Sequence, residues 1–345
     1  MGFIDNRKEY EIENMYPKRP WMNYLWNEEY IMYINQFGIG KTIMKAEKGM
    51  QREIVRDTQD RLIYIKENGK TYCINRNYTN LPFDTYKTIV GMGYSKIISE
   101  YNGIRAELLI FVPSKGKREC WRLDLTNTSD NERNLDLYGF IDVDSRISWH
   151  YPCNKDTFEE SVNGVCFQHV SYNSPTAYHC VHFATDCDIY GYDVTGKRFI
   201  GVYGNYFEPD GTKAERLASK NNVFDDFTAG SLQIKINLEP GETKRIKFTV
   251  GVETSVEAAA AATAEIFADG AFERELDIIS AKTSMYDNKI YINTPDAEVN
   301  RMANIWLKRQ MDLGKTWGRV YNMGFRDIMQ DIMGFIQLDA ERKDC

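Results

Sequence analysis

The segment SLQIKINLEPGETKRIKFTV (residues 231–250) contains two runs in which apolar and polar side chains alternate. Successive side chains of a β-strand point to opposite faces, so this period of two predicts two strands that each bury one face. The turn-forming residues Glu239-Pro240-Gly241-Glu242 separate the runs. We therefore expect a hairpin here, the clearest in the chain.

Similar runs recur through the first 250 residues. Two of them, 62–66 and 71–74, flank Asn68-Gly69, a pair that tolerates the positive φ angles of a tight hairpin turn. The run 104–112 alternates until Leu109 and Phe111 make its second face apolar as well. Many strands at short spacing, with no helical pattern between them, predict a large antiparallel β-sandwich.

The periodicity becomes helical near residue 254. Thr254-Ser255-Val256-Glu257 has the pattern of a capping box and precedes an alanine run, and Gly270 either interrupts this helix or separates two. Thr294 and Pro295 are expected as the N-cap and first turn of a further helix. Its expected apolar stripe, and the apolar positions of a last helix, are Val299, Met302, Ala303 and Trp306, then Ile328, Ile332, Phe335 and Ile336. The last helix needs packing partners, either on the sandwich or in a longer protein, and we favour a fragment of a longer protein.

Composition excludes several classes of function. The 345 residues carry a net charge of −7, which disfavours nucleic acids and anionic membranes as partners. No apolar run approaches 18 residues, so no transmembrane helix is expected. Seven cysteines without C-x-x-C spacing argue against a disulfide framework and a zinc site, and favour a reducing cytoplasm.

Two patterns resemble ligand sites without meeting their requirements. Gly40-Lys41-Thr42 and Gly314-Lys315-Thr316 lack the glycine that a phosphate-binding loop needs five residues earlier. His179, Cys180, His182 and Cys187 lie in an expected strand, where His179 and Cys180 point to opposite faces. We expect no metal ion and no cofactor.

The segment Trp317–Asp331 places polar groups in a sequence otherwise suited to burial. Asp327 and Asp331 are four residues apart, hence on one face of the last helix, and Arg326 and Gln330 form a second such pair. Sugar hydroxyls can donate to carboxylates and accept from a guanidinium, which makes a sugar site one interpretation. The other is a helix N-terminus at which Asp complements the dipole and Arg pairs with it.

The octapeptide Gly324-Phe325-Arg326-Asp327-Ile328-Met329-Gln330-Asp331 resembles the G-F-R-D-x-x-Q-D motif of the cellobiose, cellodextrin and chitobiose phosphorylases. These inverting enzymes are related to a domain of cyclic β-1,2-glucan synthases. Further matches occur in order along the chain, in Gly2-Phe3-Ile4-Asp5, Lys8-Glu9-Tyr10, Pro20-Trp21-Met22-Asn23-Tyr24-Leu25, Gly91-Met92-Gly93-Tyr94-Ser95-Lys96-Ile97, Phe199-Ile200-Gly201-Val202-Tyr203 and Asn300-Arg301-Met302-Ala303-Asn304-Ile305-Trp306.

The resemblance implies a fold and a division of the chain. It implies a galactose-mutarotase-like supersandwich over residues 1–252, a helical linker over 253–290, and the first helices of a truncated (α/α)6 barrel, of the six-hairpin glycosidase type, over 291–345. Family members form homodimers in which the N-terminal domain borders the partner's site, so a homodimer is one expectation.

The resemblance also implies reversible phosphorolysis. Inorganic phosphate, as co-substrate, attacks the anomeric carbon of a β-linked di- or oligosaccharide while one carboxylic acid protonates the leaving oxygen. The family places that acid beyond Cys345, so the chain alone is expected to be inactive. The rival hypothesis is a stand-alone carbohydrate-binding or dimerisation module.

Substrate-binding residues are inferred by matching the family motif. Asp327 matches an aspartate that binds the donor sugar, and Arg326, Gln330 and Asp331 match its neighbours. The family uses an arginine shortly upstream, where the nearest arginine here is Arg319 and the position six before Asp327 holds Tyr321. For most of Trp21, Trp26, Trp121 and Trp149, we expect core packing rather than sugar stacking.

Overall fold

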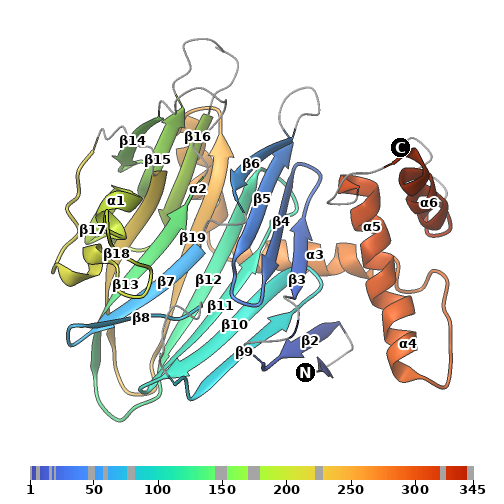
Figure 1. Cartoon of the computed structure of the whole chain (residues 1–345), viewed down its shortest axis with the longest axis horizontal. Coiled ribbons are helices and arrows are strands. Elements are labelled where there is room, and N and C mark those ends of the chain that lie inside the picture. The colour runs from blue at the N-terminus through green and yellow to red at the C-terminus, as the bar shows by residue number, and fades with distance from the viewer. Residues whose placement is uncertain are drawn as a thin grey trace.

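The computed structural model describes residues 2–4, 8–14, 18, 21–45, 51–56, 61–75, 82–143, 154–169, 179–221, 228–318 and 324–339. Within these residues the strands form sheets of ten, five and four members, with antiparallel pairing throughout (Figure 1). The predicted large antiparallel sandwich is confirmed.

The ten-stranded sheet forms one layer. Its spatial order is β1 (Gly2–Ile4), β2 (Glu9–Ile12), β9 (Thr85–Val90), β10 (Tyr94–Tyr101), β11 (Ile104–Phe111), β12 (Arg118–Asn127), β19 (Thr243–Glu253), β16 (His179–Thr185), β15 (Gly164–His169) and β14 (Asn154–Glu159).

The other layer consists of two smaller sheets. The five-stranded sheet has the order β17 (Gly191–Thr195), β18 (Thr228–Leu238), β13 (Arg133–Asp142), β7 (Arg61–Glu67) and β8 (Lys70–Cys73). The four-stranded sheet has the order β3 (Met22–Trp26), β4 (Tyr30–Asn35), β5 (Gly40–Lys45) and β6 (Gln51–Val55).

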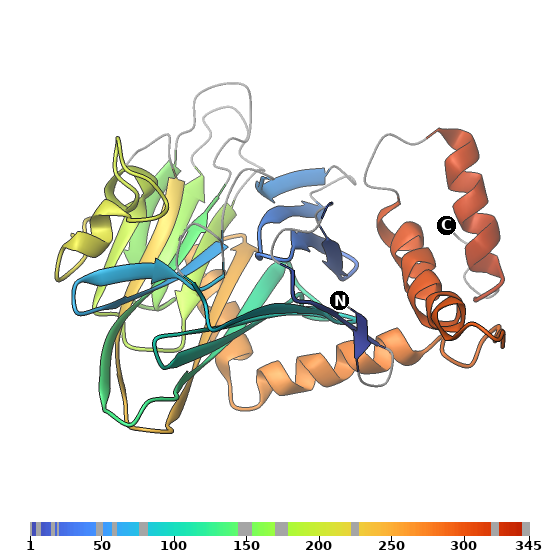
Figure 2. The ribbon, with the colours of Figure 1, turned by 60° about the horizontal axis from the view of Figure 1, so that its bottom comes forward.

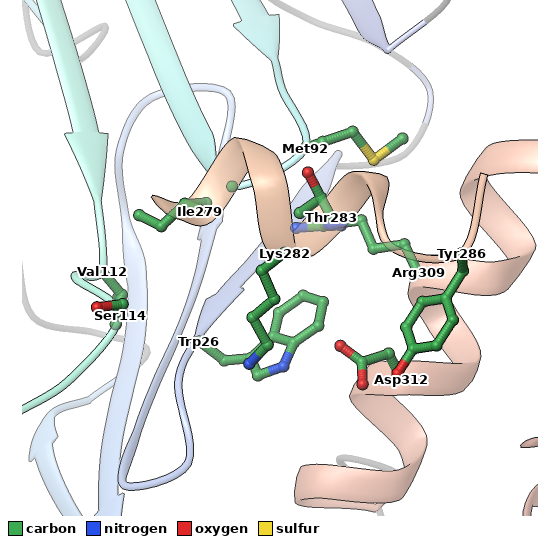
Figure 3. Close-up of a pocket in the computed structure, with 11 residues that line it drawn as sticks. Trp26, Met92, Val112, Ser114, Ile279, Lys282, Thr283, Tyr286, Arg309 and Asp312 are labelled. Carbon is green, nitrogen blue, oxygen red and sulfur yellow. The ribbon is translucent and has the colours of Figure 1, made fainter. Parts of the chain in front are cut away.

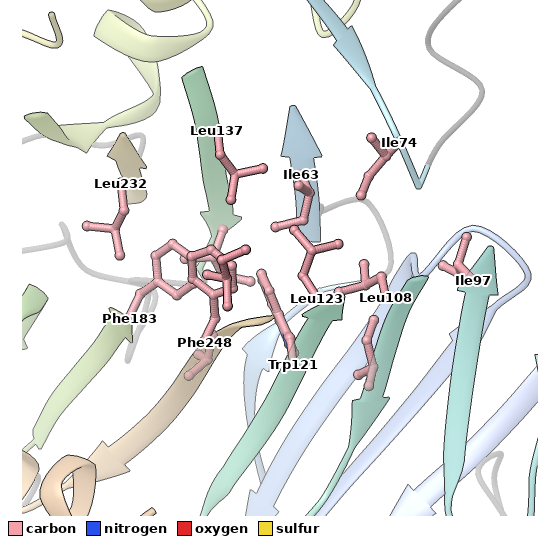
Figure 4. Close-up of a cluster of buried hydrophobic side chains, with 14 of the residues drawn as sticks. Ile63, Ile74, Ile97, Leu108, Trp121, Leu123, Leu137, Phe183, Leu232 and Phe248 are labelled. Atoms are coloured by element: carbon pink, nitrogen blue, oxygen red, sulfur yellow. The ribbon is translucent and has the colours of Figure 1, made fainter. Parts of the chain in front are cut away.

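The core lies between these layers and draws residues from all three sheets. Trp121, Phe183 and Phe248 project from the ten-stranded sheet and meet Leu137 and Leu232 of the five-stranded sheet (Figure 4). The inward-facing residues of β11, β12, β13 and β18 are those that the period of two assigned to a buried face.

The hairpin expected over residues 231–250 is wrong, although both strands exist. β18 pairs with β13 and β17, whereas β19 pairs with β12 and β16 in the opposite layer. Asn127, at the end of β12, fixes this crossing because its side chain donates to Leu238 O (3.0 Å) and its carbonyl accepts from Gly241 N (2.9 Å). A strand with one apolar face can bury that face whether the next strand joins the same sheet or the sheet of the opposite layer. The alternation therefore does not decide between these two arrangements.

The expected hairpin at residues 62–74 is confirmed. β7 and β8 pair with Glu67 opposite Lys70, and the intervening Asn68 and Gly69 have φ values of 50° and 77°. Such left-handed angles match the twist of the flanking strands.

Two helices cover the outer face of the ten-stranded sheet. α2 (Val256–Phe267) and α3 (Ala271–Ser284) are separated by Gly270, whose φ of 69° favours glycine. Phe272 of α3 packs edge-on against Phe111, with ring centroids 5.2 Å apart. This contact explains why β11 is apolar on both faces. Figure 2 shows α3 crossing beneath the strands of this sheet.

The remaining helices comprise α1 (Gly196–Phe199) and the 3₁₀ turn η3 (Asp210–Lys213) beside the five-stranded sheet, and a C-terminal group. In that group α4 (Ala297–Arg301), the π-helical turn η4 (Met302–Trp306) and α5 (Leu307–Trp317) follow one another directly, and α6 (Phe325–Ile336) packs on α5. No helix within the described ranges is long and apolar enough to cross a membrane.

Two predicted N-caps are displaced. Ser255, not Thr254, caps α2, because its hydroxyl accepts from Ala258 N at 3.2 Å. Asp296, not Thr294, caps α4 by accepting from the amides of Glu298 and Val299. An N-cap is set by the residue at which the backbone leaves the extended conformation, and the sequence offered two capping side chains in each case.

The predicted stripe on the helix after residue 294 is only half correct. Ala303 and Trp306 are partly buried, whereas Val299 and Met302 are exposed. The final helix does occur, with Phe335 buried and Ile336 exposed.

Candidate functional site

The G-F-R-D segment begins α6. Gly324 has the extended backbone of an N-cap, and its amide donates to Asp327 Oδ2 at 3.2 Å. A carboxylate in the first turn also meets the positive end of the helix dipole. This contact holds the Asp327 side chain back along the helix towards its N-terminus.

The two predicted i, i+4 pairs lie on different faces of α6. Asp327 and Asp331 are partly buried, whereas Arg326 and Gln330 are exposed. Asp331 faces α5, where a Cβ added to Gly314 would lie 3.9 Å from its Oδ2. Arg319, Tyr321 and the side chain of Ile328 lie outside the described residues.

The helix that supports α6 is docked on the outer face of the four-stranded sheet. Leu313 and Trp317 of α5 pack against Ile31, and Trp317 Nε1 donates to Asn27 O at 2.8 Å. The Lys45 ammonium lies 4.7 Å from the centroid of the Trp317 ring. For the last helix, the alternative to a fragment was packing back on the sandwich. The structure meets it only indirectly, because α5 packs on the sandwich and α6 packs on α5.

Asn23 and Arg309 lock α5 to the sandwich. Asn23 Nδ2 donates to Tyr94 O (2.9 Å) and Ser95 Oγ (3.0 Å), while Arg309 Nη2 donates to Asn23 Oδ1 (3.1 Å). The Arg309 guanidinium also lies over the Trp26 ring at 4.8 Å. Two segments that resemble family motifs, around Asn23 and Tyr94, thus hold elements together.

Beside this contact is a small pocket between β3, α3 and α5. It is lined by Trp26, Lys282, Tyr286, Arg309 and Asp312; the Lys282 side chain runs alongside Trp26, and Tyr286 lies beside Asp312 (Figure 3). Burial lowers the pKa of Arg309 to about 10, and the Asp312 carboxylate opposes this shift. The cavity of about 40 Å³ suits ordered water rather than a sugar ring.

A third segment that resembles a family motif also has a structural role. Asn300 exchanges hydrogen bonds with the backbone of Thr294, and Asn304 does the same with Ile292, at 2.8–2.9 Å. These side chains fix the approach to α4 and η4. Sequence reasoning did not separate them from ligand-binding residues, because an asparagine that binds backbone has no distinguishing pattern.

The remaining candidate residues do not form a ligand site among the described residues. Cys180 and His182 share the face of β16 that packs against α2, and among the described residues no three His, Cys, Asp or Glu side chains gather as metal ligands. The predicted core role of Trp121 is confirmed. Trp21 is instead exposed (37%), and its ring lies at 32° to that of Tyr10 with centroids 4.7 Å apart. Trp149 and the side chain of His179 lie outside the described residues.

A model of the glycosyl hydrolase 94 supersandwich domain matches residues 8–268, from just before β2 to the end of α2. The chain belongs to this family. Its relatives include solabiose phosphorylase of Paenibacillus borealis, 28% identical over 96% of this chain, and N,N'-diacetylchitobiose phosphorylase of Vibrio furnissii, 25% identical over 96%. The resemblance to chitobiose-type phosphorylases is thereby confirmed.

Glycosyl hydrolase 94 relatives are longer than this chain, which spans 44% of the length of each of these two phosphorylases. Among solved structures, a bacterial glucoamylase in complex with acarbose matches with a TM-score of 0.56 at 10% identity, covering 90% of this chain and 44% of its own. That likeness shows the fold alone.

Proposed function

We propose that the chain is the N-terminal part of an inverting sugar phosphorylase, which converts a β-glycoside and phosphate into an α-sugar 1-phosphate and a shorter sugar. The observation that carries the proposal is the G-F-R-D segment at the start of α6, on a helix pair docked to a glycosyl hydrolase 94 sandwich. The phosphorylases among the relatives support it.

In this proposal the chain divides into the sandwich (1–252), a helical linker (253–290) and the opening of an (α/α)6 barrel (291–345). The side-by-side packing of α5 and α6 is consistent with a first helical hairpin. Met311 lies against Gly334, where a Cβ would meet its Cε at 3.6 Å, so the two helices approach closely.

The donor-sugar subsite would use both faces of the motif. Asp327 and Asp331 accept hydrogen bonds from sugar hydroxyls, while Arg326, Gln330 and Arg319 donate to sugar or phosphate oxygens. The bond between Gly324 N and Asp327 Oδ2 fixes the carboxylate before a sugar arrives, which lowers the entropic cost of binding.

The chemistry requires one acid. A phosphate oxygen forms a bond to the anomeric carbon as the glycosidic C–O bond breaks, and the leaving oxygen takes a proton from a carboxylic acid. Phosphate replaces the water and general base of an inverting hydrolase. Because the resemblance places the acid beyond Cys345, the chain alone should lack activity.

A chimera tests the subsite. This chain replaces the segment that it matches in solabiose phosphorylase, and sugar 1-phosphate formed from solabiose and phosphate is measured. Asp327→Asn should lower kcat/KM about a hundredfold, since it weakens bonds to a charged acceptor that strengthen in the transition state. Glu298→Gln, which changes an exposed carboxylate on α4, should leave it unaltered.

Two results would contradict the proposal. Equal rates for the Asp327→Asn and Glu298→Gln chimeras would remove Asp327 from the subsite. Sugar 1-phosphate formed from cellobiose, laminaribiose, sophorose or chitobiose by the chain alone would show that its acid is already present.

Location and assembly are part of the proposal. Among the described residues, Cys73, Cys120, Cys166 and Cys180 are buried thiols outside any disulfide, and Cys187 is a partly buried one, which supports a reducing cytoplasm. A homodimer would follow from the resemblance, and sedimentation equilibrium of the chimera would test it.

A further inference from the structure

A cavity of about 730 Å³, broadly open to solvent, lies at the edge of the sandwich where β14 of the ten-stranded sheet meets β17 of the five-stranded sheet. This edge and α6 lie at opposite ends of the molecule (Figures 1 and 2). The cavity is therefore separate from the subsite proposed around Asp327. The volume of the cavity falls in the range of small-ligand sites.

The rim of the cavity is held in place from behind. The fully buried Gln233 accepts from Leu217 N (2.9 Å) and donates to Glu215 O (2.8 Å), so it fixes the backbone on both sides of Arg216. Asn221 Oδ1 accepts from Phe158 N at 2.8 Å, which joins the same rim to β14. Because the rim is already ordered, binding of a ligand carries no further entropic cost of ordering it.

Aromatic rings form part of the wall. Phe158 and Tyr192 are stacked with centroids 4.3 Å apart and planes at 10°, and the Arg216 guanidinium lies 5.3 Å from the centroid of Tyr190. Phe158 and Tyr192 cover one face of each other, and the faces turned away from this stack suit the C–H faces of a sugar ring. Their edges and polar tips remain able to bond hydroxyl groups.

The polar groups of the wall have mixed charge. Glu159 and Glu160 supply acceptors, Arg216 supplies donors, and Asn221 supplies both. The Lys235 ammonium also lies 4.7 Å from the centroid of Tyr190, but it pairs with Asp136. A phosphate or nucleotide would still face two lining carboxylates for one lining guanidinium, and an apolar ligand would leave these groups unsatisfied. Neutral, hydroxyl-rich molecules can donate to the carboxylates and accept from the guanidinium together.

We propose that this cavity, bounded by Phe158, Glu160, Tyr190, Tyr192, Arg216 and Asn221, binds a neutral oligosaccharide at a site distinct from the phosphorolytic one. The inference does not depend on the proposed reaction. Its function would be to hold a glycan on the sandwich without cleaving it.

The test is isothermal titration calorimetry of the full chain with cellotetraose, laminaritetraose and chitotetraose. Arg216→Ala and Glu160→Ala change exposed side chains and should preserve folding. Each should weaken saturable binding about tenfold, as expected for loss of one hydrogen bond to a charged group. Lys213→Ala, an exposed cation of the same segment paired with Asp210, is the matched control and should bind normally.

Asp327→Asn separates the two sites and should leave this binding unchanged. The proposal is overturned if none of the three sugars binds saturably. It is also overturned if both cavity variants bind as tightly as the unmodified chain, or if Asp327→Asn alone abolishes binding.

Discussion

Arg61 and Glu119 form an ion pair across the interior of the sandwich, with Arg61 Nε 2.5 Å from Glu119 Oε1 and both side chains inaccessible to water. The pair joins β7 to β12. Arg61 Nη1 also donates to Gly40 O (2.8 Å) on β5, so one guanidinium links all three sheets. Trp121 Nε1 and Thr42 Oγ1 donate to the Glu119 carboxylate at 3.1 and 3.0 Å, which satisfies the buried charge.

Breaking this pair should destabilise the sandwich strongly. Glu119→Gln leaves the Arg61 charge buried without its counter-ion, and we expect a loss of about 3–5 kcal/mol in the free energy of unfolding. Arg245→Ala, which removes a more exposed ion pair with Asp124, should cost about 0–1 kcal/mol. Urea unfolding measures both, and similar losses would contradict the prediction.

Replacing both partners should be far milder than replacing one. Arg61→Met with Glu119→Leu removes the two charges together, so no buried ion remains uncompensated. We expect urea unfolding of the double variant to lie much closer to the unmodified chain than to Glu119→Gln. A double variant as unstable as the single one would assign the effect to packing rather than charge.

His182 should make stability fall at acid pH. It is fully buried, and this burial, followed by the Arg118 charge, lowers its pKa to about 3. In the unfolded chain the pKa of His182 is about 6.5. Between pH 3 and pH 6.5, His182 therefore binds a proton in the unfolded state only. The contribution of neutral His182 to the free energy of unfolding is complete above pH 6.5. It is lost as the pH falls towards 3, by roughly 1.4 kcal/mol per pH unit.

The measurement is the free energy of unfolding of the unmodified chain and His182→Gln at pH 7.5, 5.5 and 4.5. The difference between them should change with pH as stated, which separates His182 from the other titrating groups. Parallel pH profiles for the two proteins would show that His182 is protonated equally in the folded and unfolded states.

Removing the Asn23 side chain should loosen α5. Asn23→Ala leaves the Tyr94 carbonyl and one Arg309 donor without this partner, and we expect a cost of roughly 1–3 kcal/mol. Amides of α5 should exchange with deuterium faster than those of the core strands. Asn134→Ala, at an exposed position on β13, is the control. Equal exchange in both variants would assign no anchoring role to Asn23.

The exposed side of α6 should promote self-association. Phe325 (79% exposed) and Met333 (66%) lie with Met329 and Ile336 along one helical stripe. Met333→Lys should shift sedimentation-velocity profiles towards the monomer without lowering stability, whereas Met285→Lys, on an exposed methionine just after α3, should not. A monodisperse, two-state unmodified chain at all concentrations would refute the association.

Which elements exist could be read largely from the sequence. The period of two in residues 104–112 and 231–250 reports which side chains are buried, because a strand alternates its faces whatever its partner. The second apolar face at Leu109 and Phe111 marked the position later found to be covered by α3. Helix caps were right to within one or two residues, since adjacent residues compete to be the N-cap.

The candidate site was predictable only as a motif. The spacing of Asp327 and Asp331 placed them on one face of α6, but not which helix that face would meet. The structural roles of Asn23, Asn300 and Asn304 depend on backbone groups that folding brings close, in the case of Asn23 from 68 and 71 residues away. Such contacts cannot be inferred from the spacing of residues in the sequence.

Sequence alone determined the strands, the helices and the family motif, because these depend on local periodicity and residue identity. Only the tertiary structure decided that β18 and β19 belong to opposite layers, and that Arg61 and Glu119 meet between them. An apolar face specifies that it must be buried and leaves its partner open. That choice is made by the fit of all three sheets and by the need to pair every buried charge.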